Sequence, residues 1–372
     1  MGTETQRHDE RHLQVQERVS REIVQALGLT LTLDEDRRLS HRDIKNVRAF
    51  ELYLEARQEL RRLGVATARG QALLEQAIAI EGESAPLLAL RAWGMVALLR
   101  TGLGDPTTLD EIERKADALM TMAPDASFGY AIRAWAKYER GDFRRAIPDF
   151  RQAIARDPND TDSRLYLTMA LNMSGLFNAA KESASHLMAT DQLSWMSSVA
   201  VGAVGWFDGG TAGGIDQLRR GVELDPANFI AHWCLGYALS SVRDLTDAAA
   251  EVAWLVAAGP HVPYTIQLQA LVLAQQGDTR QALTLVSALD LSPFDNHITF
   301  HFAEVFAICG EAERALDVLE SSVNKGFCPT PFIEVHCRFL ESLRSHVRFA
   351  PIVATASAMS AAIRREVESS LS

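Results

Sequence analysis

The sequence has few cysteines, no long apolar run and no excess of positive charge, and each absence disfavours a class of protein. Four cysteines occur among 372 residues, without CxxC spacing, which favours a reducing compartment and inert thiols over a disulfide framework. No run of about 18 apolar residues and no apolar signal core occur, so we expect a cytoplasmic chain without a membrane span. The net charge of −11 argues against broad contact with nucleic acid or anionic lipid.

Catalytic and metal-binding motifs are also missing. The stretch DGGTAGG (208–214) lacks the GK[ST] ending of a phosphate-binding loop and follows no predicted strand. Cys328, His336 and Cys337 match no standard metal spacing, and no HExxH occurs. We therefore predict no catalytic residue, no metal and no cofactor, and an autonomous enzyme is the least favoured interpretation.

Residues 127–260 contain one pattern written four times at a spacing of 34 residues. Its landmark is a proline or its replacement, and a turn glycine or its replacement precedes that landmark by 17 residues. Small residues recur between these two points, where paired helices would touch. The landmarks are Pro158, Gln192, Pro226 and Pro260; the turn residues Gly141, Gly175, Gly209 and Arg243; and the small residues Ala146, Ala180, Gly214 and Ala248. Self-similarity at this period is typical of a tetratricopeptide repeat (TPR) solenoid.

The pattern predicts an all-α fold, a right-handed α-α superhelix of about eight helix pairs with an N-terminal helix and C-terminal capping helices. One helix pair cannot bury its apolar face alone, so the pairs must stack. We expect three segments: an N-terminal helix and connector (1–45), a TPR array (46–325) and capping helices (326–372).

Apolar periodicity extends the helix predictions beyond the four regular copies. Thr108 and Glu111 have the spacing of a capping box at one helix start. Two further helix–turn–helix repeats are predicted at Pro263–Leu289 and His297–Val323, with turns at Gly277 and Gly310. The other predicted helical stretches are Arg11–Leu27, Asn46–Leu63, Ala66–Ile80, Ser84–Leu99, Thr108–Met122, Phe332–Ser345 and Phe349–Glu368.

Three stretches resemble the C-terminal TPR region of bacterial signalling proteins, namely serine/threonine kinases, nucleotide cyclases and winged-helix regulators. They are VQERVSREIVQAL, AFELYLEARQELRRL with ALLEQAIAIE, and the tail ERALDVLESSVNKGF…FLESLRSHVRFAPIV, where Val347 replaces the usual proline. The resemblance implies a TPR architecture in a signalling or regulatory pathway. It implies no kinase activity, because the sequence has no GxGxxG loop, HRD or DFG.

The first helix of each repeat should line the concave face of the superhelix, and its in-phase positions are rich in aromatic residues and methionine. Such a surface favours partner binding, although the same side chains could instead pack against a tightly wound inner wall. The predicted groove residues are Phe128, Trp135, Tyr138, Met169, Asn172, Met173, Trp206, Phe207, Trp233, Tyr237 and Tyr264.

These residues lack the Lys and Asn clamp that holds acidic peptide tails, so a peptide with an apolar anchor or an amphipathic helix fits better. We therefore predict a non-enzymatic scaffold for a protein partner, with no nucleic acid or membrane and with self-association left open. The alternative is the regulatory fragment of a larger kinase, cyclase or transcription regulator. On the groove interpretation, replacing Trp233 and Tyr237 together by alanine should weaken partner binding without unfolding the array.

Overall fold

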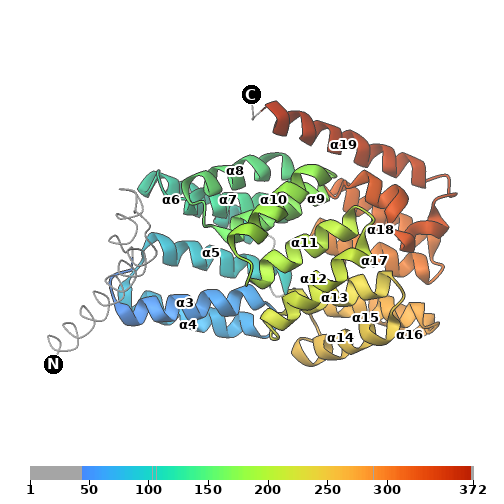
Figure 1. The fold of residues 1–372 in the computed structure, drawn as a ribbon, viewed down its shortest axis with the longest axis horizontal. Coiled ribbons are helices and arrows are strands. Elements are labelled where there is room, and N and C mark those ends of the chain that lie inside the picture. Colours follow the sequence, from blue (N-terminus) through green and yellow to red (C-terminus); the bar gives the residue numbers. More distant parts are fainter. Residues whose placement is uncertain (1–43, 103, 106, 288, 370–372) are drawn as a thin grey trace.

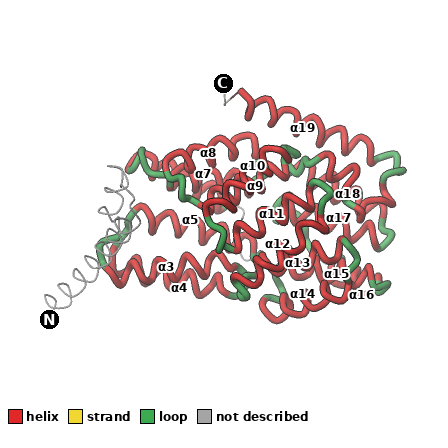
Figure 2. The backbone as a smooth tube through the Cα atoms, viewed as in Figure 1, coloured by secondary structure: helices red, strands yellow, loops and turns green. Residues whose placement is uncertain are grey.

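The computed structural model describes residues 44–102, 104–105, 107–287 and 289–369, and within these ranges all regular secondary structure is helical (Figures 1 and 2). The long helices are α3 (Val47–Arg62), α4 (Ala66–Glu81), α5 (Ala85–Arg100), α6 (Thr108–Met122), α7 (Phe128–Glu139), α8 (Phe143–Arg156), α9 (Thr161–Met173), α10 (Phe177–Thr190), α11 (Trp195–Phe207), α12 (Thr211–Leu224), α13 (Phe229–Ser241), α14 (Leu245–Ala258), α15 (Pro263–Gln275), α16 (Thr279–Val286), α17 (Asn296–Ile308), α18 (Ala312–Asn324) and α19 (Phe349–Ser369). This arrangement confirms the predicted all-α superhelix. The helix predicted at Arg11–Leu27 lies outside the described residues.

The repeat landmarks perform the roles that their spacing predicts. The turns between paired helices place Gly141, Gly175 and Gly209 at φ of 74°, 73° and 83°, and Arg243 adopts φ 67° at the equivalent point. At the helix–helix contacts, Ala146, Ala180 and Ala248 are fully buried. A Cβ at Gly214 would lie 2.8 Å from the carbonyl oxygen of Gly202, so the fourth contact leaves no room for a side chain.

Helix starts are fixed by short polar caps. Asp142 caps α8 by accepting from the Arg145 amide at 3.2 Å, and Asp160 caps α9 by accepting from the Ser163 amide at 3.0 Å. The predicted capping box at Thr108 and Glu111 is wrong, since Thr108 is the first helical residue and the N-cap residue, Thr107, makes no side-chain capping bond.

The C-terminal segment departs from one prediction and fulfils another. In place of a continuous helix over Phe332–Ser345, a π-helical turn (Phe332–His336) and a 3₁₀ turn (Arg338–Leu343) occur. They are separated by Cys337, which is extended because its side chain turns inward to Glu304. Helix α19 follows over Phe349–Ser369, almost as predicted, and returns along the upper edge of Figure 1 to contact α8.

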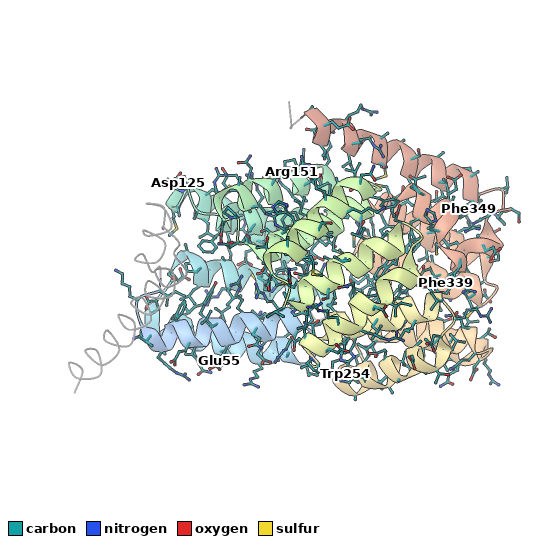
Figure 3. All side chains as sticks on the ribbon, in the orientation of Figure 1. Glu55, Asp125, Arg151, Trp254, Phe339 and Phe349 are labelled. Atoms are coloured by element: carbon teal, nitrogen blue, oxygen red, sulfur yellow. The ribbon has the colours of Figure 1, made fainter. Side chains whose placement is uncertain are left out.

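The core follows the stacked helices from α3 to α19 without a break, and side chains fill the spaces between them (Figure 3). No helix in the described part of the chain is both long enough and apolar enough to cross a membrane.

Candidate binding site on the superhelix axis

The array winds tightly enough for its first repeat to touch later ones. Asp162, at the start of α9, accepts from Arg57 Nη2 at 2.8 Å and from Arg61 Nε at 2.8 Å, both on α3. Arg62 Nη2 lies 3.0 Å from Asp225 Oδ1 in the loop before α13. These ion pairs close one side of the concave face.

The C-terminal segment closes the other side with backbone contacts. The Cys328 amide donates to the Met173 carbonyl oxygen at 2.9 Å, and Ser360 Oγ donates to the Ser174 carbonyl oxygen at 2.6 Å. The turn glycines approach this segment so closely that a Cβ on Gly141 would lie 1.8 Å from the Lys325 carbonyl oxygen. The inner helices therefore surround an axis rather than an open groove.

Two cavities remain on this axis. The outer cavity has a volume of about 220 Å³ and lies between α3, α5, α7 and the start of α9. The inner cavity has a volume of about 60 Å³ and is lined mainly by aromatic and methionine side chains of the inner helices. Arg61 lines both, so the two cavities are neighbours.

A buried ion pair lies at the inner cavity. Arg100 Nε donates to Glu139 Oε1 at 2.8 Å, and Arg100 Nη1 donates to the Tyr166 hydroxyl at 3.0 Å. The guanidinium carbon lies 5.0 Å from the centre of the Tyr166 ring, a cation–π distance. Burial raises the pKa of Glu139 to about 7 even though Arg100 opposes the rise.

Behind the inner cavity, a second polar cluster is sealed from solvent. Glu304 Oε1 accepts from the Tyr237 hydroxyl at 2.7 Å and from Cys337 Sγ at 3.1 Å. His301 Nδ1 lies 2.6 Å from Glu304 Oε2, and its Nε2 lies 3.0 Å from His297 Nε2. Burial raises the pKa of Glu304 to about 8 and lowers the pKa of His301 to about 3. This cluster links α13, α17 and the C-terminal cap.

Eight of the eleven predicted groove residues line the axial cavities. Phe128 and Trp135 line the outer one. The inner one is lined by Tyr138, Met169, Met173, Trp206, Trp233 and Tyr264. The other three line neither. Phe207 packs on Phe327 and Phe332 under the cap, and Tyr237 belongs to the Glu304 cluster. Asn172 is fully buried, and its side-chain amide has no hydrogen-bond partner among the described residues.

Their exposure differs from that of an open groove. Phe128 and Met169 are partly exposed, and the other nine are buried. Trp233 and Tyr237 are among the largest fully buried side chains. Each change to alanine would remove a core aromatic ring, so the structure argues against the expectation that both could be replaced without loss of stability. Their part in partner binding stays a prediction.

The sequence-based site omitted the charged residues of the axis. Asp162 occupies the same repeat position as Phe128 and Met196, so a charge at an otherwise apolar position was the available signal. Glu139 shares its repeat position with Met173 but also with Ser241, so its charge stood out less. Arg57, Arg61 and Arg100 recur at no fixed repeat position and carried no such signal.

The cysteines and histidines give no sign of metal or nucleophile chemistry. Among the residues that the structure describes, no group of three or more His, Cys, Asp or Glu side chains is arranged to hold a metal ion. Burial raises the pKa of Cys328 to about 12 and that of Cys337 well above its ordinary value, which disfavours reactive thiolates.

Comparison with known proteins agrees with this geometry. A family model described as tetratricopeptide repeat matches residues 133–181. No curated protein is significantly similar to the chain. The chain is an all-helical repeat protein with an α-α superhelical fold. The family match and the superhelical structures below support a tetratricopeptide repeat architecture.

Several solved structures share the fold at low sequence identity. A Rap protein complexed with competence and sporulation factor has a TM-score of 0.57 and 9% identity, covering 86% of this chain and 99% of that one. The APC/C hetero-tetramer Cut9–Hcn1 has a TM-score of 0.54 and 14% identity, covering 90% of this chain and 64% of that one. The human IFIT1 dimer with m7Gppp-AAAA has a TM-score of 0.51 and 12% identity, covering 81% of this chain and 76% of that one. Identities this low show likeness of fold alone.

Proposed function

We propose that this protein is a non-enzymatic TPR scaffold that binds a short, extended peptide segment of a protein partner in its outer and inner cavities. The observation that carries the proposal is that eight aromatic and methionine side chains, at in-phase positions of the repeats, cluster around one axis. Aromatic and methionine side chains provide an adaptable apolar anchor site.

The space on the axis distinguishes between two kinds of partner segment, an amphipathic helix and an extended peptide. An α-helix with its side chains is about 10–12 Å across, which requires an open groove. The ion pairs of α3 with Asp162 and Asp225 close such a groove. An extended segment, or the end of a chain, is therefore the better occupant than an amphipathic helix.

Two further features support this class of ligand. The Rap protein of similar fold is complexed with competence and sporulation factor, so a superhelix of this kind can bind another molecule. The net charge of −11 disfavours a ligand such as the m7Gppp-AAAA of the IFIT1 structure, which carries many phosphates.

The cellular setting is part of the proposal. The resemblance to TPR regions of bacterial signalling proteins favours a role in bacterial signalling or regulation. Four free cysteines favour a reducing compartment such as the cytoplasm. The alternative, a regulatory fragment of a larger kinase, cyclase or transcription regulator, would be favoured if a neighbouring reading frame encoded such a domain.

Capture of short random-sequence peptides on the immobilised chain tests the proposal. Phe128→Ala and Met169→Ala are the informative variants, because these two cavity residues are partly exposed and lie at the edge of the core rather than within it. Tyr130→Ala is the matched control, since Tyr130 lies on the same helix as Phe128 but packs on Arg156 outside both cavities. Capture lost in the first two variants and kept in the control supports the proposal. Equal capture by all four proteins contradicts it.

A further inference from the structure

The outer cavity has more negative than positive charge in its wall. Asp157, Asp160 and Asp162 line it, against Arg57 and Arg61. Both arginines pair with Asp162. Among the described residues, no cation lies within ion-pair distance of Asp157 or Asp160, and Arg57 and Arg164 act on Asp160 only from a longer distance.

Within the described ranges, the hydrogen bonds of these two carboxylates are local. Asp160 accepts from the Ser163 amide at 3.0 Å and from the Ser163 hydroxyl at 2.6 Å. Asp157 accepts from the Asn159 amide at 3.1 Å. Burial, reinforced by the neighbouring Asp162, raises the pKa of Asp160 to about 6. A guest cation would relieve this unfavourable environment of the Asp160 carboxylate.

Aromatic rings also line the same cavity. The rings of Trp93 and Trp135 lie 4.7 Å apart between centroids, and Tyr53 and Phe128 complete the wall. Trp135 is only 9% exposed, and its indole N–H is buried without an acceptor. An acceptor atom brought in by a ligand, such as a peptide carbonyl oxygen, is the partner that this donor lacks.

We propose that the outer cavity is the subsite for an arginine side chain of the bound peptide. A flat guanidinium stacks on aromatic faces and pairs with carboxylates, and the apolar stem of arginine suits the remaining wall. The volume of about 220 Å³ is below the roughly 300–1,000 Å³ of a small-molecule site, which suits one side chain. This inference names the ligand chemistry of the proposed peptide site and rests on that proposed function.

Two blocked amino acids of the same shape provide the test: N-acetyl-arginine amide and its uncharged analogue N-acetyl-citrulline amide. Each is titrated into the full chain at a pH well above the pKa of Asp160, and the indole N–H signals of Trp93 and Trp135 are followed by NMR. We expect the arginine compound to shift these signals with at least about fivefold higher affinity than the citrulline compound.

Asp160→Asn is the critical variant, because asparagine caps a helix as well as aspartate does and only the charge is lost. Asp142→Asn, at the N-cap of α8 outside the cavity, is the matched control. The arginine preference should disappear in the first variant and persist in the second. Equal affinity for both compounds, or an arginine preference unchanged by Asp160→Asn, would overturn the inference.

The two proposals can fail separately. If captured peptides lack arginine while their capture still depends on Phe128 and Met169, the arginine subsite is refuted and the peptide scaffold stands. If capture is independent of Phe128 and Met169, the scaffold proposal fails whatever the blocked amino acids do.

Discussion

Glu304 Oε2 lies 2.6 Å from His301 Nδ1, and neither side chain is exposed to solvent. One neutral arrangement satisfies every contact of this pair. A protonated Glu304 donates from Oε2 to His301 Nδ1, His301 donates from Nε2 to His297, and Glu304 Oε1 accepts from Tyr237 and Cys337. A neutral network is the favourable state here, because a buried charge without a counter-charge is costly.

The protonation of Glu304 gives a pH-dependent prediction. The pKa of Glu304 is raised from about 4.5 to about 8, so its contribution to stability is full below the ordinary value and is lost as the pH rises through about 8. Between these values, the wild type should lose up to about 1.4 kcal/mol of unfolding free energy per pH unit relative to Glu304→Gln. The depressed pKa of His301 affects both proteins alike and cancels in the difference.

Denaturant unfolding of both proteins across this pH range measures that difference. Glu55→Gln, on the exposed face of α3, is the control and should differ from the wild type by the same amount at every pH. A Glu304→Gln difference that does not change with pH would show that Glu304 is ionised in the folded protein.

The turn glycine Gly141 should tolerate no side chain. Gly141→Ala incurs the left-handed strain of roughly 1–2 kcal/mol and also drives Cβ into the Lys325 carbonyl oxygen. Gly277 has the same left-handed backbone with open space around it, so Gly277→Ala should show the strain alone. We expect Gly141→Ala to cost at least about 3 kcal/mol and to expose the backbone near Gly326 to hydrogen exchange. Equal costs for the two variants would mean that the cap does not dock on this turn.

Asp162 should hold the first repeat against the fourth. Burial acts to raise the pKa of Asp162, but the positive charges of Arg61 and Arg57 lower it to about 2. The stabilisation is therefore present above about pH 3.9 and is lost as the pH falls through about 2. Asp162→Asn should cost about 2 kcal/mol, less than a fully buried pair because both arginines are partly exposed. Asp110→Asn removes an equally charged but exposed partner of Arg140 and should cost almost nothing. Thermal unfolding distinguishes the two, and similar costs would contradict a role for Asp162 in closing the array.

Core truncation should behave differently from surface truncation. Trp233→Ala and Tyr237→Ala should each cost about 3–5 kcal/mol, because both rings are fully buried. Leu193→Ala should change the unfolding free energy by less than about 0.5 kcal/mol, since Leu193 is 77% exposed. If the Trp233 variant were as stable as the Leu193 variant, the closed superhelix would be wrong.

The period of the sequence predicts the local architecture well. Turn residues such as Gly175 and Arg243, and small residues such as Ala180, determine where each helix pair bends and touches. Those contacts lie within one repeat, so spacing alone reveals them. The break at Cys337 was not predictable, because the inward turn of that residue depends on Glu304, which lies 33 positions away in the sequence.

The closure of the superhelix could not be predicted from spacing. It depends on small rotations between repeats that accumulate along the array. They bring Arg61 to Asp162 across 101 positions. The same inner-helix residues face the axis in an open and in a closed superhelix, so the sequence identified most of the cavity lining but not its burial.

NMR contacts between a captured peptide and the methionine methyl groups test the central claim most directly. Met169 and Met173 line the inner cavity, whereas Met122 is 65% exposed at the end of α6. We expect nuclear Overhauser contacts from the bound peptide to Met169 and Met173 and none to Met122. A peptide that binds without any contact to Met169 or Met173 would place the binding site off the superhelix axis and contradict the account.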